Sequence, residues 1–128
     1  MAQAAAILRG EIAPRLEVGT LESTRDYIDF GDVARALVFL AHHEQPHSVV
    51  NVASGRETSI GEILQQTLSC CGLGGRVEVV TSANPGAVTR HVADVSRMRG
   101  LGFSPKISIG QSLDALMQYY LNHVEKSR

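Results

Sequence analysis

Three histidines are the first side chains whose type and spacing could perform chemistry. His42, His43 and His47 are close enough in sequence to suggest a metal site. Metal sites of this kind normally include carboxylate or thiolate ligands as well. Glu44 is the only carboxylate or thiolate residue at ligand spacing from these histidines. The pattern therefore favours cationic capping of a helix end, or simple exposure, over metal binding.

Two further sets of residues near the middle of the chain, a cysteine pair and a glycine-rich run, could perform chemistry or bind a ligand. Cys70 and Cys71 are adjacent and lack the C-x-x-C spacing that lowers a thiol pKa, so we interpret both as packing residues. The run Gly72-Leu73-Gly74-Gly75 could cradle an anion if it preceded a helix. It instead follows a predicted helix, where glycine is typical of the helix end.

Three helices are predicted to position whatever site the chain carries. The first has Asp29 as N-cap and Asp32 in its first turn, and it ends near His43; we assign both carboxylates mainly to helix capping. The second opens with the capping box Ser59-Ile60-Gly61-Glu62, and the third repeats that pattern with Ser108 and Gln111. The apolar positions expected to face inward are Val33, Ala36, Leu37, Leu40 and Ala41 in the first, Ile60, Ile63, Leu64, Thr67 and Leu68 in the second, and Ile109, Leu113, Leu116, Met117, Tyr120 and Val124 in the third.

Shorter segments complete an alternating pattern of helices and strands. Short helices are expected at 1–9 and 94–99, and strands at 15–18, 48–53, 76–81 and 89–93. The alternation indicates an α/β fold, with residues 1–128 forming a single domain. The strand at 48–53 is apolar on both faces except for Asn51, which predicts a strand inside a sheet with a neighbour on each side. The chain offers few candidates for those neighbours, so part of the architecture is expected to be missing.

The composition excludes several classes of partner. The 128 residues are 44% hydrophobic, and 12 Lys and Arg stand against 13 Asp and Glu, for a formal net charge of −1. There is no basic surplus to attract phosphate backbones or anionic lipid, so we expect neither nucleic acid nor membrane as a partner. The uncharged start, Met1 to Leu8, is too short for a signal peptide or a span, and the expected compartment is the cytoplasm.

The string from Glu22 to Ala36, which contains Arg25-Asp26-Tyr27-Ile28-Asp29, carries a family resemblance. It resembles the R-D-Y-I-D-V-x-D-V-A-x-A segment of the nucleotide-sugar epimerases, dehydratases and reductases, the extended short-chain dehydrogenases/reductases (extended SDRs). The branch it resembles most is that of GDP-mannose 4,6-dehydratase and GDP-4-keto-6-deoxymannose reductase. Further matches follow in the family's order at Val50-Asn51-Val52-Ala53-Ser54-Gly55, Ser59-Ile60-Gly61-Glu62-Ile63, Ala93-Asp94-Val95-Ser96-Arg97, Leu101-Gly102-Phe103-Ser104-Pro105 and Ser112-Leu113.

The resemblance implies a C-terminal, substrate-binding portion of an extended SDR that lacks the N-terminal Rossmann half. The family binds NAD(P) on a glycine-rich turn and uses a Tyr-x-x-x-Lys pair as its acid/base apparatus. The sequence contains no glycine-rich turn of this kind. It also contains no Tyr-x-x-x-Lys pair, because the residues four positions after Tyr27, Tyr119 and Tyr120 are Gly31, His123 and Val124. We therefore expect no cofactor in this chain and no catalysis by this chain alone.

The family's substrate contacts map onto three positions. The Arg of R-D-Y reaches the substrate diphosphate, which assigns that role to Arg25; the alternative is a surface arginine paired with Asp26 or Glu22. A second contact set, R-P-x-D, aligns with Asn84-Pro85-Gly86-Ala87, so Asn84 stands where the family has its phosphate-binding Arg. Arg90 could replace that cation only if the loop is rebuilt.

Two functions remain open at this point. In the first, the chain holds a nucleoside-diphosphate sugar while an absent half supplies NAD(P) and catalysis. In the second, it is a non-catalytic module that acts through oligomerisation or protein interaction, which the neutral residues at Asn84 and Ala87 favour. An apolar surface left by the missing half would then be buried in a homo-oligomer.

Overall fold

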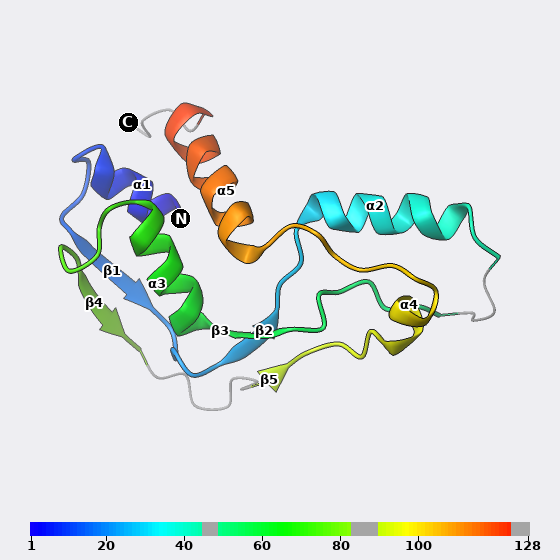
Figure 1. Cartoon of the computed structure of the whole chain (residues 1–128). Coiled ribbons are helices and arrows are strands. Elements are labelled where there is room, and N and C mark those ends of the chain that lie inside the picture. The colour runs from blue at the N-terminus through cyan, green and yellow to red at the C-terminus, as the bar shows by residue number, and fades with distance from the viewer. Residues whose placement is uncertain (45–48, 83–89, 124–128) are drawn as a thin grey trace.

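The computed structural model describes residues 1–44, 49–82 and 90–123. The candidate residues His47 and Asn84, and Val124 of the third predicted helix, lie outside these ranges. The described part contains helices interspersed with short strands, as Figure 1 shows. The helices are α1 (Ala2–Leu8), α2 (Phe30–Ala41), α3 (Ile60–Cys70), α4 (Ser96–Gly100) and α5 (Ile109–His123). The strands are β1 (Arg15–Val18), β2 (Thr24–Asp26), β3 (Glu57–Ser59), β4 (Glu78–Thr81) and β5 (Arg90–His91).

The strands form two small sheets. β1 and β4 pair in parallel, with Arg15 opposite Glu78. β2 lies at the centre of the second sheet, antiparallel to β3 and parallel to β5. The mixed α/β fold that the sequence predicts is therefore present.

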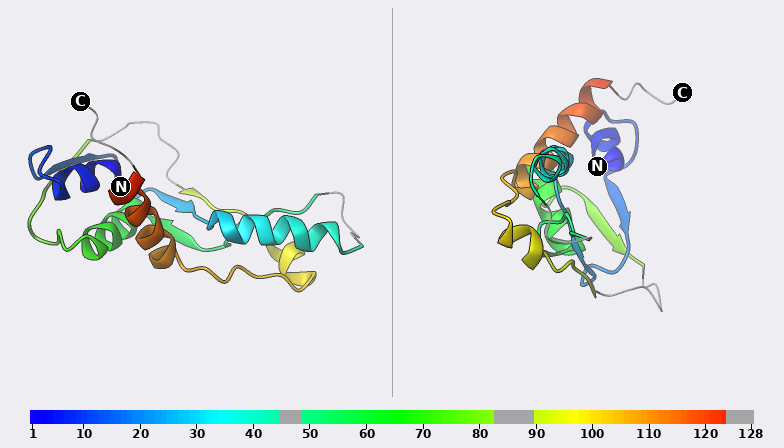
Figure 2. Two further views of the ribbon diagram at one scale, coloured as in Figure 1. Left: turned by 90° about the horizontal axis from the view of Figure 1, so that it is seen from above. Right: turned by 90° about the vertical axis from the view of Figure 1, so that its right-hand side faces the viewer.

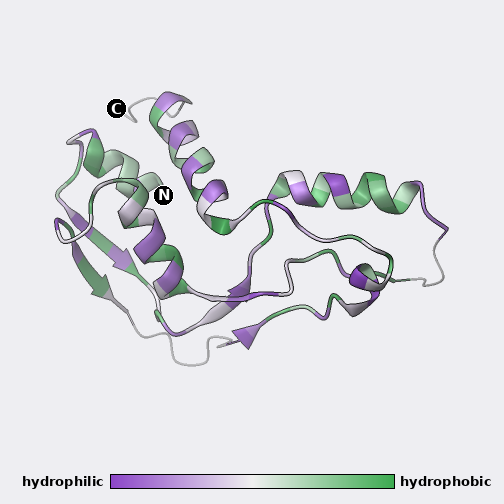
Figure 3. Ribbon diagram, viewed as in Figure 1, coloured by the Kyte–Doolittle hydropathy of each residue, from purple (hydrophilic) through white to green (hydrophobic). Residues whose placement is uncertain are grey.

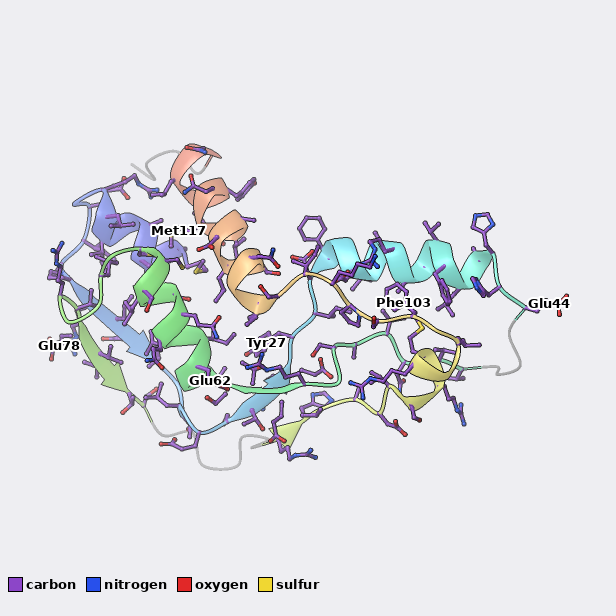
Figure 4. The ribbon with its side chains drawn as sticks, viewed as in Figure 1. Tyr27, Glu44, Glu62, Glu78, Phe103 and Met117 are labelled. Atoms are coloured by element: carbon purple, nitrogen blue, oxygen red, sulfur yellow. The ribbon has the colours of Figure 1, made fainter. Side chains whose placement is uncertain are left out.

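The hydrophobic core is divided between the two ends of the molecule. At one end Ala4, Ala5, Leu73 and Met117 pack together, where α1, α3 and α5 meet (Figures 1 and 4). At the other end Ala36 of α2 packs against Met98 and Phe103, with Val50 and Val52 beside them. Figure 2 shows α2 extending away from the α1/α3/α5 end, so the second cluster has fewer layers around it.

The helix caps match the sequence-based predictions. The Asp29 side chain accepts a hydrogen bond from the backbone N–H of Gly31 at the start of α2. Ser59 and Glu62 form the reciprocal capping box of α3, and Ser108 and Gln111 exchange the equivalent bonds before α5. These contacts lie within four residues of sequence, which explains why the sequence alone predicts them.

Several predictions about burial and strands are wrong. Leu37 and Leu116 were expected to face inward, but they are 59% and 43% exposed. Residues 49–53 form no strand, because no other strand of the described chain lies beside them. β4 begins at Glu78 rather than at residue 76, and only Arg90–His91 remains of the strand expected at 89–93. Two short strands, β2 and β3, were not predicted.

Asp32 does more than favour the start of a helix. Its side chain is fully buried and accepts hydrogen bonds from the backbone N–H groups of Lys106 (2.9 Å) and Ile107 (2.8 Å). It also pairs with Arg35 one turn further along α2. The carboxylate therefore ties α2 to the segment that leads into α5, a role that the prediction of helix capping alone did not include.

Gly55 is the glycine whose position tolerates no side chain. Its φ of +69° lies in the left-handed region, and an added Cβ would stand 2.4 Å from Cγ2 of Val95 and 2.9 Å from a guanidinium nitrogen of Arg99. Both the backbone and the close approach require glycine.

No helix in the described ranges has the length and apolar character needed to cross a membrane.

Replacing Asp32 by Ala is expected to lower the free energy of unfolding by about 3 kcal/mol or more, because two buried backbone donors lose their acceptor. Arg35→Ala is the matched control, and we expect a smaller loss of about 1–2 kcal/mol because Asp32 keeps both backbone donors. Urea denaturation measures both. Equal losses for the two variants would show that the ion pair, and not the backbone anchoring, is the main contribution.

Gly55→Ala is expected to destabilise the fold by about 2 kcal/mol or more, since strain at positive φ adds to the contact with Val95. Gly74→Ala serves as its control, because a Cβ there meets nothing within 4 Å. Thermal or urea unfolding compares the two. A Gly55→Ala variant as stable as Gly74→Ala would contradict the tight packing described at this turn.

Candidate functional site

β2 places Arg25 and Asp26 on opposite faces of the three-stranded sheet. Successive side chains of a strand point to opposite faces. Arg25 stands between Thr58 of β3 and His91 of β5, whereas Thr24 stands between Ser59 and Arg90. The sheet thus separates an Arg25 face from a face that carries Thr24 and Asp26.

The Asp26 carboxylate fixes β2 relative to the loops around it. One oxygen accepts hydrogen bonds from the backbone N–H of Ser54 (2.8 Å) and from the Ser54 hydroxyl (2.5 Å). The other accepts from the backbone N–H groups of Gly55 (2.9 Å) and Ala93 (3.4 Å). Asp26 therefore joins three segments that are distant in sequence and holds Arg25, its neighbour, in a defined position.

Arg25 is half-buried, and no acidic side chain in the described part of the chain neutralises its guanidinium. Its Nη1 donates to the backbone carbonyl of Thr24 at 2.7 Å. Among the described residues it forms no ion pair, so the alternative of pairing with Glu22 or Asp26 is not realised. A guanidinium held this way presents its remaining N–H donors to an acceptor such as a phosphoryl oxygen.

His91 is a neighbour of Arg25 that the sequence analysis did not single out. It is exposed, and its Cα is the register partner of Arg25 across the parallel β2–β5 pair. The signal that could have identified it is its place two residues before Ala93-Asp94, but the pairing with β2 depends on contacts more than sixty residues apart.

Arg90 is engaged on the other face of the sheet. Its Nε donates to Glu57 at 3.1 Å, and Thr24 Oγ1 donates to the second oxygen of Glu57 at 2.7 Å. The hydrogen bond from Thr24, followed by that from Arg90, lowers the pKa of the Glu57 carboxyl below its ordinary value. The structure therefore does not bring Arg90 together with Arg25.

The histidines and cysteines form no metal centre within the described residues. His42 is the C-cap of α2, and His43 stacks on Phe39 with ring centroids 3.8 Å apart, consistent with the predicted helix end. Cys70 is exposed as a residue, which corrects its assignment as a packing residue, and Cys71 is half-buried. Partial burial of the thiol nevertheless raises the pKa of Cys70 to about 11, so it is a weak nucleophile near neutral pH.

A hollow of about 580 Å³ lies between the start of α2 and α5, lined by Ile28, Phe30, Leu116 and Tyr119 among others. Its lining is mostly apolar. Asp29 and Ser112 contribute to it, but the Ser112 hydroxyl donates to Asp29 at 2.5 Å, so these polar groups satisfy each other. The hollow therefore lacks the charged donors that a diphosphate needs.

The N-termini of α2 and α3 do not suit the pyrophosphate of a dinucleotide cofactor. Pyrophosphate binds to free backbone N–H groups at a helix N-terminus that follows a glycine-rich turn. At α2 and α3 those N–H groups are capped by the side chains of Asp29 and Ser59, and carboxylates at Asp32 and Glu62 occupy the first turns. The added negative charge opposes a pyrophosphate at either helix.

Comparison with known proteins identifies the family of this chain. The family model for GDP-mannose 4,6 dehydratase matches residues 1–116. GDP-6-deoxy-D-mannose reductase of Pseudomonas aeruginosa is 32% identical over 97% of this chain, and the match spans 41% of that protein. A putative GDP-L-fucose synthase of Oryza sativa subsp. japonica is 31% identical over 82% of this chain and 30% of its own length.

Solved structures show the same partial match. The structure of RMD from Pseudomonas aeruginosa, complexed with NADPH, superposes with a TM-score of 0.85 at 30% identity, covering 94% of this chain and 40% of that one. UDP-glucose 4-epimerase of Thermotoga maritima has the same fold, with a TM-score of 0.76 at 23% identity, covering 95% of this chain and 38% of that one. The chain thus spans well under half the length of these proteins. It belongs to the GDP-mannose 4,6-dehydratase family of extended SDRs and corresponds to a C-terminal portion of their fold.

Proposed function

We propose that this chain forms the sugar-nucleotide-binding part of an NAD(P)-dependent nucleotide-sugar reductase, dehydratase or epimerase, and that Arg25 binds the diphosphate of a GDP-sugar. The observation that carries the proposal is the half-buried Arg25 guanidinium, which has no acidic partner among the described residues. The matching family model and the two relatives described above are named for GDP-sugars, which supports GDP over other nucleotides. Hydride chemistry would come from NAD(P) bound outside the residues described.

The environment of Arg25 suits a dianionic ligand. A permanently charged, planar donor fork binds phosphoryl oxygens through two parallel hydrogen bonds. One donor of Arg25 is already bound to the Thr24 carbonyl, which restricts the rotation of the guanidinium and reduces the entropy lost when a ligand binds.

His91 supplies a second contact in this proposal. Its register with Arg25 across the β2–β5 pair supports a contact between its imidazole and the same diphosphate. Asn84 remains a proposed contact from the aligned R-P-x-D position, and Arg90 is the weaker candidate because Glu57 holds its Nε on the opposite face.

Arg25→Ala is expected to raise the Kd for GDP-mannose by about 10- to 100-fold, because the diphosphate loses one charged hydrogen-bond partner. Isothermal titration calorimetry measures it. Arg15→Ala is the matched control, since it removes the same charge from the other sheet, where Arg15 lies beside Glu17. An unchanged Kd in Arg25→Ala, or no heat with any GDP-, UDP- or dTDP-sugar, would overturn the proposal.

His91→Gln is expected to raise the same Kd by about 2- to 10-fold, because one hydrogen bond of ordinary strength is lost. The Arg25→Ala/His91→Gln double variant tests whether both side chains bind one group. A contact with the same diphosphate predicts non-additive losses in binding free energy. Strictly additive losses would place His91 outside the binding site.

A further inference from the structure

The backbone of β1 faces β4 at every second residue. Among the described strands, β1 pairs only with β4. The carbonyls of Pro14 and Val18 accept hydrogen bonds of 2.9 Å from the backbone N–H groups of Glu78 and Ser82, so the backbone groups of the even-numbered residues point toward β4. Because these directions alternate along a strand, the odd-numbered residues of β1 direct their backbone groups to the opposite edge.

This opposite edge is open among the described residues. Its odd-numbered residues are Arg15 and Glu17. The Arg15 N–H donates to the Ala13 carbonyl at 2.7 Å, but the Glu17 N–H and the carbonyls of Arg15 and Glu17 have no hydrogen-bond partner in the described ranges. An edge with such free groups is a template for the addition of another strand.

Charged side chains of both signs line this edge on the exposed face of the sheet. The side chains of Arg15 and Glu17 are 52% and 73% exposed, and their charged groups lie 3.7 Å apart. Glu78 of β4 is the register partner of Arg15 and is also exposed, so it lies on the same face. Figure 3 shows hydrophilic stretches on β1 beside a largely hydrophobic β4. Charges at an edge normally prevent strand pairing, and whether they do so here depends on the register.

We propose that β1 pairs with β1 of a second copy of this chain, antiparallel and centred on Leu16, to form a continuous four-stranded sheet. In two strands related by a two-fold axis, the residues whose backbone groups are free must lie opposite each other. Centring the pair on Leu16 places Arg15 opposite Glu17 of the second copy, and the symmetry repeats this pair. The same backbone rule allows centring on Arg15 or on Glu17, but each of these puts two identical charges opposite each other. The charges therefore select one register, in which the chain is complementary to itself.

The resulting row of charges alternates in sign across the sheet. Each Arg15 guanidinium lies between Glu78 of its own chain and Glu17 of the second copy, all on the exposed face. Opposite charges directly across two strands stabilise the pairing, and like charges destabilise it. Because the edge is only four residues long, the dimer is weak and reversible. The interface lies in a different sheet from Arg25, so it does not depend on the proposed sugar-nucleotide site.

Analytical ultracentrifugation of the complete chain, at micromolar to millimolar concentrations, tests the association. The average mass should rise from 13.8 kDa toward twice that value as the concentration increases. A mass that stays at the monomer value at millimolar concentration would overturn the proposal.

Charge reversal tests the register. Glu17→Arg should raise the dimer Kd by about tenfold or more, because it places two arginines opposite each other at both symmetric pairs. Glu44→Arg makes the same change in charge on an exposed residue beyond the far end of α2 and should leave the Kd unchanged (Figure 4). An equal mixture of the Arg15→Glu and Glu17→Arg variants should associate more tightly than either variant alone. Equal effects of Glu17→Arg and Glu44→Arg, or no association in the mixture, would overturn the register.

Nuclear Overhauser spectra test the strand pairing without a substitution. Directly opposite residues in a non-hydrogen-bonded antiparallel pair bring their Cα atoms to about 4.5 Å, the closest approach between two strands. In an equal mixture of ¹³C-labelled and unlabelled chains, the Hα of Leu16 should therefore show a contact to the Hα of Leu16 in the second copy. A dimer that lacks this contact would overturn the pairing of β1, whatever its response to charge reversal.

Discussion

The Asp26 carboxylate accepts hydrogen bonds from Ser54, Gly55 and Ala93, and the geometry of the candidate site depends on this interaction. Hydrogen bonds to a charged acceptor contribute about 1.5–3 kcal/mol each, so four donors hold a three-residue strand that has little apolar surface of its own. Gly55 is required because its N–H reaches Asp26 while Val95 and Arg99 occupy the space of a side chain. With Asp26 fixed toward these loops, the alternation of β2 directs Arg25 to the other face.

The two ends of the molecule differ in how completely they are packed. Around Met117, three helices bury a common cluster. Around Ala36 and Phe103, one helix, a short helical turn and an unpaired segment share a smaller cluster, and Leu37, Val38 and Val49 remain exposed. The cluster at the α2 end is therefore less completely covered than the cluster at the α1/α3/α5 end.

Features set by neighbouring residues could be predicted from the sequence, and features set by distant pairing could not. The caps at Asp29, Ser59 and Ser108 involve residues at most three apart, and all three are confirmed. β2 and β3 are short and polar, and they form only because the two segments pair with each other, with Arg25 opposite Thr58, which is thirty-three residues away in sequence. Residues 49–53 illustrate the converse, since their apolar pattern predicts a strand, but none of the described strands pairs with them. For the site, the sequence identifies Arg25 through its family motif, whereas His91 becomes a candidate only through the β2–β5 register.

In the proposed site, Arg25 and His91 face one diphosphate from the same side of a sheet. Nitrogen–proton correlation spectra of the arginine Nε and histidine ring groups, recorded while GDP-mannose is added to the ¹⁵N-labelled chain, test it most directly. The account predicts that the Arg25 Nε–H and His91 ring signals shift together along one saturating curve, while those of Arg15 and Arg97 stay in place. Shifts confined to other arginines, or an Arg25 signal that does not move at saturation, would contradict it.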